Sequence, residues 1–259
     1  MDKKYTVEDL LEILKVLRGE NGCPWDRAQT HESIKKSMIE ETYEAIDALD
    51  SGDDHAFSNE LGDVLLQVAF HATLADERGA FNFDDIVREI CTKLITRHTH
   101  VFGKDKAASA EEALGNWEKN KKKEKGLKSN TELLDDVPHS LPALMRAQNV
   151  KKKAASCGFD WEDISGVMDK IKEEAQELCD AAAEKSEEKI AEEYGDLLFS
   201  AVNLGRFLKV DSEVALANAT NKFIRRFAKM EKFAENECKD FSGLSPKEMD
   251  DLWKKAKQK

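Results

Sequence analysis

The chain has 259 residues, of which 36% are charged and 41% hydrophobic, so it can form one or two domains with a substantial core. The apolar fraction and 12 Phe exclude a disordered chain, while only 4 Pro and 13 Gly favour long helices over a many-turned β-fold. The net charge of -12 disfavours nonspecific binding to nucleic acid or to an anionic membrane. Any anionic ligand would therefore need local cations.

Targeting signals and disulfides are not expected. The longest apolar stretch, residues 64–70, is far shorter than the ~18 residues of a membrane span. Residues 1–4 have no apolar segment behind them, so we predict no secretory signal. The cysteines are scattered without a CxxC pair, which indicates reduced thiols in a cytoplasmic protein and argues against structural zinc. They are Cys23, Cys91, Cys157, Cys179 and Cys238.

Apolar residues recur at a period of about 3.6 through most of the chain, which is typical of amphipathic helices. The first such helix is predicted from the spacing of Val7, Leu10, Leu11, Leu14 and Leu17. A second apolar run includes Ile34, Met38 and Ile46. Further helices are predicted near residues 54–75, 84–97, 110–123, 143–156, 166–184, 187–208, 212–236 and 246–257. The last would begin with a capping box between Ser245 and Glu248, with Pro246 at the first helical position.

A boundary between two halves is predicted near residues 125–140, where a lysine-rich stretch at 119–128 is followed by Pro138 and Pro142. We therefore expect an all-α fold of two tandem helical modules. The predicted organisation is a module over residues 1–125, a linker over 126–140 and a module over 141–259.

The two halves share an acidic pattern, which indicates an internal repeat. The first copy reads Glu40-Glu41-x-x-Glu44 followed by Glu60-x-x-Asp63, and the second reads Glu173-Glu174-x-x-Glu177 followed by Glu193-x-x-Asp196. One offset of 133 residues superposes them, with Gly62 on Gly195. Further along the chain, at shifted offsets, Lys93-x-x-x-Arg97 corresponds to Lys222-x-x-x-Arg226 and Trp117-x-x-x-Lys121 corresponds to Trp253-x-x-x-Lys257.

Each acidic pattern should fold into an antiparallel helix hairpin. Acids three residues apart share one face of a helix. Short connections make neighbouring helices antiparallel, so residues equidistant from the turn face each other. The two sets are centred on Gly52 and on Lys185. The sequence therefore predicts four acids at one level of each hairpin.

Grouped carboxylates need a neutralising partner, because two of them ~4 Å apart repel by roughly 4 kcal/mol at an effective dielectric of about 20. No Glu-x-x-His pair accompanies the acids, which favours an all-oxygen site for Mg²⁺, with Mn²⁺ as a substitute. The alternative is that they are ordinary solvated surface charges. The predicted ligands are Glu174, Glu177, Glu193 and Asp196, and in the first repeat Glu41, Glu44, Glu60 and Asp63.

Cations in the second copy suit a metal-chelated polyphosphate, since carboxylate-bound Mg²⁺ keeps positions open for phosphate oxygens. Trp253 could stack on a base, or it could be a core residue. The predicted nucleotide-binding residues are Lys170, Lys172, Lys189, Lys222, Arg226, Trp253 and Lys257. In the first copy the positions of Lys170, Lys172 and Lys189 hold Ser37, Ile39 and Ala56. We therefore expect the second site to be the better catalyst.

The sequence resembles the MazG family of nucleoside triphosphate pyrophosphohydrolases nearly end to end. The resemblance is carried by both acidic sets and by Cys23-Pro24-Trp25-Asp26, Gly158-Phe159-Asp160-Trp161, Asn221-Lys222-Phe223, Arg226-Phe227 and Leu252-Trp253. The segment at residues 96–103 departs from the family pattern RRHPHVFG by having Thr96 and Thr99. The resemblance implies an all-α homodimer, Mg²⁺ dependence and metal ligands at the second-copy acids, with Lys189, Lys222, Arg226 and Trp253 near the nucleotide.

The predicted reaction is Mg²⁺-dependent hydrolysis of NTP or dNTP to a nucleoside monophosphate and pyrophosphate. Broad base specificity is expected, since a single stacking Trp accepts any base. Glu173, Glu174 or Glu177 could serve as the base, and the sequence does not choose among them. The alternatives are a non-catalytic sensor or scaffold that binds metal and nucleotide, and a structural helical dimer whose acids are surface charges. No membrane or nucleic acid polymer is expected as a partner.

Overall fold

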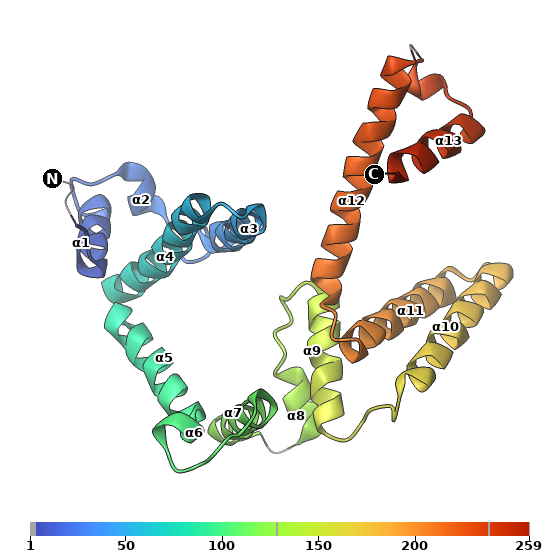
Figure 1. Cartoon of the computed structure of the whole chain (residues 1–259). Helices are drawn as coiled ribbons and strands as arrows, with labels where there is room; N and C mark the ends of the chain where they lie inside the picture. Colours follow the sequence, from blue (N-terminus) through green and yellow to red (C-terminus); the bar gives the residue numbers. More distant parts are fainter. Residues whose placement is uncertain (1–3, 128, 238, 259) are drawn as a thin grey trace. The chain divides into compact units, whose positions relative to one another are not determined.

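The computed structural model describes residues 4–127, 129–237 and 239–258 (Figure 1). Within these residues the chain forms α-helices, one short 3-10 turn and no strand, which confirms the predicted all-α fold. The chain divides into two compact units, Met1–Glu124 and Lys125–Lys259. Cys238 lies outside the described residues.

The first unit contains seven helices among its described residues. They are α1 (Val7–Arg18), α2 (Pro24–Ala28), α3 (Lys35–Ser51), α4 (Asp54–Glu77), α5 (Phe83–Arg97), α6 (Thr99–Phe102) and α7 (Ala110–Glu124). The helices α3 and α4 form an antiparallel hairpin, and α1 packs against α4.

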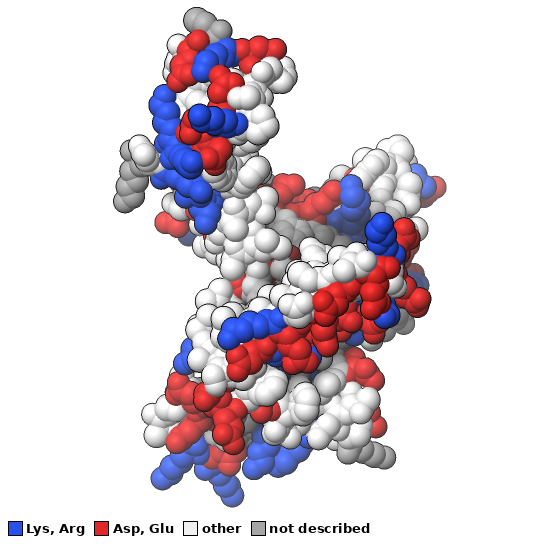
Figure 2. All heavy atoms as spheres, turned by 90° about the vertical axis from the view of Figure 1, so that its right-hand side faces the viewer, with Lys and Arg blue, Asp and Glu red and all other residues white. Residues whose placement is uncertain are grey.

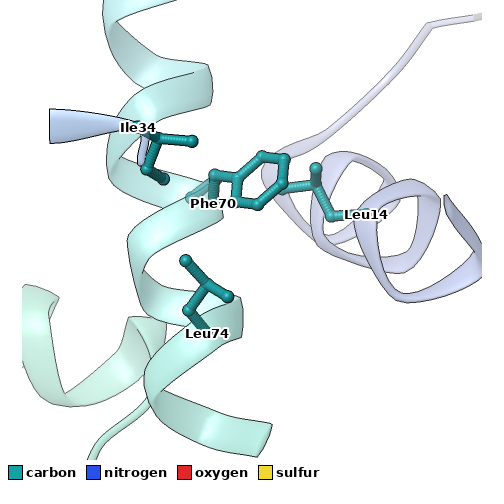
Figure 3. Packing of buried hydrophobic residues seen from close by; sticks show 5 residues of the cluster. Leu14, Ile34, Phe70 and Leu74 are labelled. Carbon is teal, nitrogen blue, oxygen red and sulfur yellow. The ribbon is translucent and has the colours of Figure 1, made fainter. Parts of the chain in front are cut away.

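The core of the first unit lies where α1 meets α4. Leu14 on α1 is 1% exposed and packs with Phe70 and Leu74 of α4 and with Ile34, which caps α3 (Figure 3). Burying a side chain of this size contributes roughly 1.5–3 kcal/mol. The core therefore holds the C-terminal half of α4 against α1, and α4 is one arm of the hairpin.

The second unit contains α8 (Asn130–Asp135), α9 (Ala143–Ser156), α10 (Ile164–Glu184), α11 (Glu187–Phe207), α12 (Ser212–Asn236), the 3-10 turn η1 (Phe241–Gly243) and α13 (Pro246–Lys257). The helices α10 and α11 pack against each other as a hairpin, and α9 packs against α11 and α12. A small core of Met230, Ala234, Leu252 and Ala256 joins α12 to α13.

The start of α13 follows the predicted capping box. The backbone amide of Glu248 donates to Oγ of Ser245, and the amide of Ser245 donates to a carboxylate oxygen of Glu248 at 3.0 Å. Pro246 occupies the first turn, where its missing N–H costs no hydrogen bond. Both groups at the helix start are thus satisfied by side chains three residues apart.

The segment predicted as a linker is partly helical. It contains α8, which begins at the N-cap Ser129 and packs against α9. Nζ of Lys153 on α9 donates to the carbonyl oxygen of Leu133 at 2.9 Å and lies 3.0 Å from Oδ2 of Asp136. These contacts attach the segment to the second unit.

None of the helices in the described part of the chain has both the length and the apolar character needed to span a bilayer.

Candidate metal and nucleotide site

The helices α10 and α11 bring three carboxylates of the second unit together. Glu174 and Glu177 lie one turn apart on α10, and Glu193 comes from α11. One oxygen of each carboxylate lies within 4.8 Å of the other two. Glu174 is only 4% exposed, so this acidic group is partly withdrawn from water. Acidic side chains form a band across the face shown in Figure 2, at the level of this hairpin in Figure 1.

The turn of the hairpin sets this register. Lys185 ends α10 with φ 56, in the left-handed conformation that reverses a helix end, and Ser186 starts α11. Because the two arms leave this turn antiparallel, Glu177 and Glu193, each eight residues from Lys185, reach the same level. The sequence spacing thus translates directly into the carboxylate group.

The first unit repeats the arrangement on α3 and α4. Glu41, Glu44 and Glu60 each place one carboxylate oxygen within 4.8 Å of the other two. Gly52 ends α3 in the left-handed region with φ 74, and the side chain of Asp53 caps α4 by accepting from the amides of His55 and Ala56. The centre of symmetry read from the sequence is therefore the actual turn.

The repulsion within each group is visible in the pKa values. The pKa of Glu177 is raised by desolvation, by the charge of Glu193 and by the neighbouring Glu174. Desolvation also raises the pKa of Glu41, followed by the charge of Asp63 and then that of Glu44. Each group would therefore gain from a cation that removes the repulsion between its carboxylates.

The residues present suit a divalent cation. In the described residues, both groups consist of carboxylates alone, without histidine or cysteine. Carboxylate oxygens are the ligands that hard cations such as Mg²⁺ and Mn²⁺ prefer. After desolvation, the neighbouring carboxylates contribute to the raised pKa values of Glu177 and Glu41. Surface acids often lack any ion, but the burial of Glu174 distinguishes the second group from such a surface.

The fourth acid of each predicted set lies outside the group of three. Asp63 is near enough for its charge to raise the pKa of Glu41. Asp196 is exposed, and its charge acts on Lys151 of α9, whose pKa it raises against the larger lowering by burial. Each of these aspartates follows the grouped glutamate of its helix by one turn, so they border the groups.

The predicted cations near the acids differ in what they contact. Nζ of Lys170 lies 2.7 Å from Oε1 of Glu173 and 2.8 Å from Oε1 of Glu174, so this lysine contacts the acidic group directly. Lys189 pairs with Glu184 at 2.7 Å, and the charge of Glu193 also raises its pKa. Lys172 instead pairs with Asp169 on its own helix, both side chains being largely exposed.

The remaining predicted nucleotide-binding residues gather around Trp253 on α13. The guanidinium carbon of Arg226 lies 5.9 Å from the ring centroid of Trp253, and Nζ of Lys257 lies 5.5 Å from it. The ring of Phe223 lies 5.2 Å away at a tilt of 47°. Trp253 packs against the small α12–α13 core and is partly exposed. Lys222 is exposed one turn before Arg226.

The acidic group and the Trp253 group are separate in the described residues, since no ion pair or ring contact joins them. The hairpin packs chiefly against α9, whereas α13 packs against α12. The structure therefore brings the predicted residues together as two groups within the second unit.

The first unit contains a matching aromatic group on α5 and α7. Arg97 lies 5.2 Å and Lys121 lies 5.1 Å from the ring of Trp117. These are the residues that correspond in sequence to Arg226, Lys257 and Trp253. The repeat thus extends beyond the acids to an indole placed between an arginine and a lysine.

One residue near the second site was not singled out by the sequence. Lys151 on α9 places its Nζ 4.4 Å from the ring centroid of Phe199 on α11. Burial lowers its pKa most, followed by the charge of Arg206, while Asp160 and Asp196 act in the opposite direction. A lone lysine in a helix gives no signal in sequence, because its environment depends on how α9 packs against α11.

Comparison with known proteins agrees with this architecture. The sequence matches the family model described as MazG nucleotide pyrophosphohydrolase domain over residues 29–102 and 163–230, which include both acidic hairpins. It is 47% identical to the nucleoside triphosphate pyrophosphohydrolase/pyrophosphatase MazG of Thermotoga maritima, over 96% of this chain and 95% of that protein. It is 42% identical to the nucleoside triphosphate pyrophosphohydrolase of Escherichia coli K12, over 97% of both chains.

A tandem all-α chain with paired acidic hairpins and this degree of similarity defines an enzyme class that hydrolyses phosphoric anhydride bonds. The chain belongs to the MazG family of nucleotide pyrophosphohydrolases. The family resemblance inferred from the sequence is confirmed, and so are the tandem helical modules.

Proposed function

We propose that the second unit hydrolyses nucleoside triphosphates, both NTP and dNTP, to nucleoside monophosphate and pyrophosphate in a Mg²⁺-dependent reaction. The observation that carries the proposal is the group of three carboxylates at the buried Glu174, with Lys170 beside it. Glu174, Glu177 and Glu193 would hold the ion, and Asp196 borders them. A divalent ion bound there would neutralise phosphate charge and lower the pKa of coordinated water.

The chain's own residues would supply the remaining chemistry. A carboxylate beside the cation is placed to accept a proton from the attacking water, which makes Glu173, Glu174 and Glu177 the candidate bases. Lys170 and Lys189 carry the positive charge that would balance the triphosphate on the α10–α11 hairpin.

The nucleoside would lie against the Trp253 group. Stacking on the indole face accepts any base, which supports broad base specificity. Arg226 would contact phosphate oxygens, because a guanidinium matches phosphate with two parallel hydrogen bonds. Lys257 and the exposed Lys222 would contact phosphate oxygens as point charges. The sequence-predicted Lys172 would act only as part of the surrounding positive charge, since it pairs with Asp169.

The acidic hairpins are also proposed to form a homodimer interface. Tyr194 and Leu198 of α11 are 55% and 41% exposed, and Tyr43 and Ile46 of α3 are 51% and 47% exposed. Several exposed apolar side chains on the same helices are typical of a surface that a partner covers. A second copy would cover them and complete the surroundings of the acidic groups.

We propose that the protein acts in the cytoplasm. Cys23, Cys91, Cys157 and Cys179 are free thiols, which suits a reducing compartment. Neither a membrane nor a nucleic acid polymer is part of the proposal, in view of the net charge of -12.

The test is to incubate the protein with each common NTP and dNTP and Mg²⁺ and to measure nucleoside monophosphate and pyrophosphate. We expect both products in equal amounts from all bases, and no reaction after chelation of the metal. A sensor or scaffold would leave the triphosphate intact, and release of inorganic phosphate instead of pyrophosphate would contradict the assigned bond.

A further inference from the structure

The aromatic groups of the two units differ in one contact. In the first unit the guanidinium of Arg97 is held by the carboxylate of Glu124, with Nε to Oε2 at 2.8 Å and Nη2 to Oε1 at 2.9 Å. Glu124 is the last residue of α7, whereas Arg97 is the last residue of α5. The side chain of Arg97 is only 12% exposed in this arrangement.

The equivalent arginine of the second unit has no such partner. Arg226 stacks near Trp253 as Arg97 stacks near Trp117, but the described residues provide no carboxylate in ion-pair contact with it. The guanidinium nitrogens that bind Glu124 in Arg97 are therefore available to a ligand in Arg226.

A carboxylate and a phosphate compete for the same face of an arginine. Both present two oxygens that accept parallel hydrogen bonds from Nε and a terminal nitrogen. A carboxylate on the same chain binds the guanidinium without the loss of translational and rotational freedom that a free nucleotide incurs, so it competes well with a free nucleotide. Glu124 therefore occupies the position in which a phosphate would bind.

We propose that the first unit contains a second nucleoside triphosphate site whose arginine is blocked by Glu124, so that the two units differ by an internal carboxylate as well as by their lysines. This inference rests on the proposed function, because the ligand class is taken from the Arg226–Trp253 group.

The aromatic group has other contacts that preserve it when Glu124 is replaced. Nδ2 of Asn120 on α7 donates to the carbonyl oxygen of Arg97 at 3.3 Å and to Oγ1 of Thr99 at 2.9 Å. Arg97 and Lys121 also lie over the ring of Trp117, at 5.2 and 5.1 Å from its centroid. A substitution at Glu124 should thus release the guanidinium without separating α5 from α7.

The test measures how many molecules of an α,β-methylene nucleoside triphosphate bind per full-length chain, by equilibrium dialysis with Mg²⁺. This probe resists cleavage of the α–β bond. The wild-type protein should bind one molecule per chain, and Glu124→Gln should bind a second, more weakly. Adding Arg97→Ala to Glu124→Gln should remove the second molecule again.

The matched control is Glu77→Gln. Glu77 holds Arg18 by two hydrogen bonds of 2.6 and 2.7 Å in the same unit, so this variant loses the same kind of ion pair and the same charge. It should still bind one molecule. Pyrophosphate release by the second unit should be unchanged in both variants.

Wild-type binding of two molecules per chain would overturn the proposal, and so would a folded Glu124→Gln variant that still binds one. If Glu124→Gln does not fold, Glu124→Ala removes the carboxylate by another route, and a folded Glu124→Ala variant that binds only one molecule would also overturn it. The proposed function has its own test. It is contradicted if the Arg226→Ala variant still binds the one molecule per chain that the wild-type protein binds.

Discussion

Protonation of the Glu177 carboxylate should make the stability and the metal affinity of the acidic group depend on pH. Because its folded-state pKa is raised, protonation of Glu177 stabilises the metal-free fold, and this contribution is lost as the pH rises through the raised pKa. A bound cation requires the deprotonated form. Metal and proton therefore compete at this residue.

We predict that Mn²⁺ raises the melting temperature at about pH 8 and that this gain disappears as the pH is lowered through the raised pKa of Glu177. At 100 times its dissociation constant, the ion should contribute about 2.7 kcal/mol. Glu177→Gln should lose much of the gain, whereas Glu192→Gln on the neighbouring exposed position should keep it. A gain that does not change with pH would contradict metal binding by this group.

Substituting Trp253 should affect substrate binding. Base stacking on an aromatic ring contributes about 1–3 kcal/mol, so Trp253→Ala should raise KM roughly 5-fold to 150-fold with a smaller change in kcat. Trp253→Phe keeps a stacking face and should retain most of the affinity. Steady-state kinetics with GTP and ATP measure this, with the exposed Trp25→Ala as the control. A lower kcat at unchanged KM would contradict a stacking role.

Sequence spacing predicts the acidic groups well because it depends on two fixed geometries, the helix period and the reversal at Gly52 and Lys185. Three acids of each predicted set of four lie within 4.8 Å of one another, and Asp63 and Asp196 stay predicted ligands at the border of these groups. The contact between Arg97 and Glu124 could not be predicted, because it joins two helices whose packing no short-range pattern encodes.

At the scale of the element, the two hairpins differ in the residue that reverses the chain. Gly52 has φ 74 without steric cost, while Lys185 has φ 56, where a side chain is disfavoured. We predict that Lys185→Gly stabilises the second unit by up to about 1 kcal/mol. Gln176→Gly, inside the same helix, should destabilise it by about 1 kcal/mol. Denaturant unfolding measures both, and a loss of stability in Lys185→Gly would contradict the turn geometry.

Long helices are predictable from the sequence, while short ones are not. The predicted helices at 212–236 and 246–257 coincide with α12 and α13. The six-residue α8 falls in the predicted linker, because so few residues show no clear period and such a helix depends on packing against α9. The predicted linker at residues 126–140 therefore contains a short helix that depends on tertiary contacts.

At the scale of the whole molecule, each unit has its own core. Leu14 and Phe70 stabilise the first unit, and Met230 and Leu252 stabilise the second. We predict that Leu14→Ala lowers the stability of the first unit by about 2–5 kcal/mol, while pyrophosphate release continues below that unit's transition. Calorimetry should show one displaced transition, and Leu252→Ala should displace the other. Equal displacement of both transitions by Leu14→Ala would contradict separate cores.

The most direct test of the account compares the two acidic groups by matched substitutions. Glu174→Gln with Glu177→Gln removes two carboxylates from the second group, and Glu41→Gln with Glu44→Gln removes the corresponding two from the first. Pyrophosphate release from GTP and Mg²⁺ should fall to background in the second-unit variant and persist in the first-unit variant. Wild-type release by a folded Glu174→Gln, Glu177→Gln protein would contradict the assignment of hydrolysis to the α10–α11 hairpin.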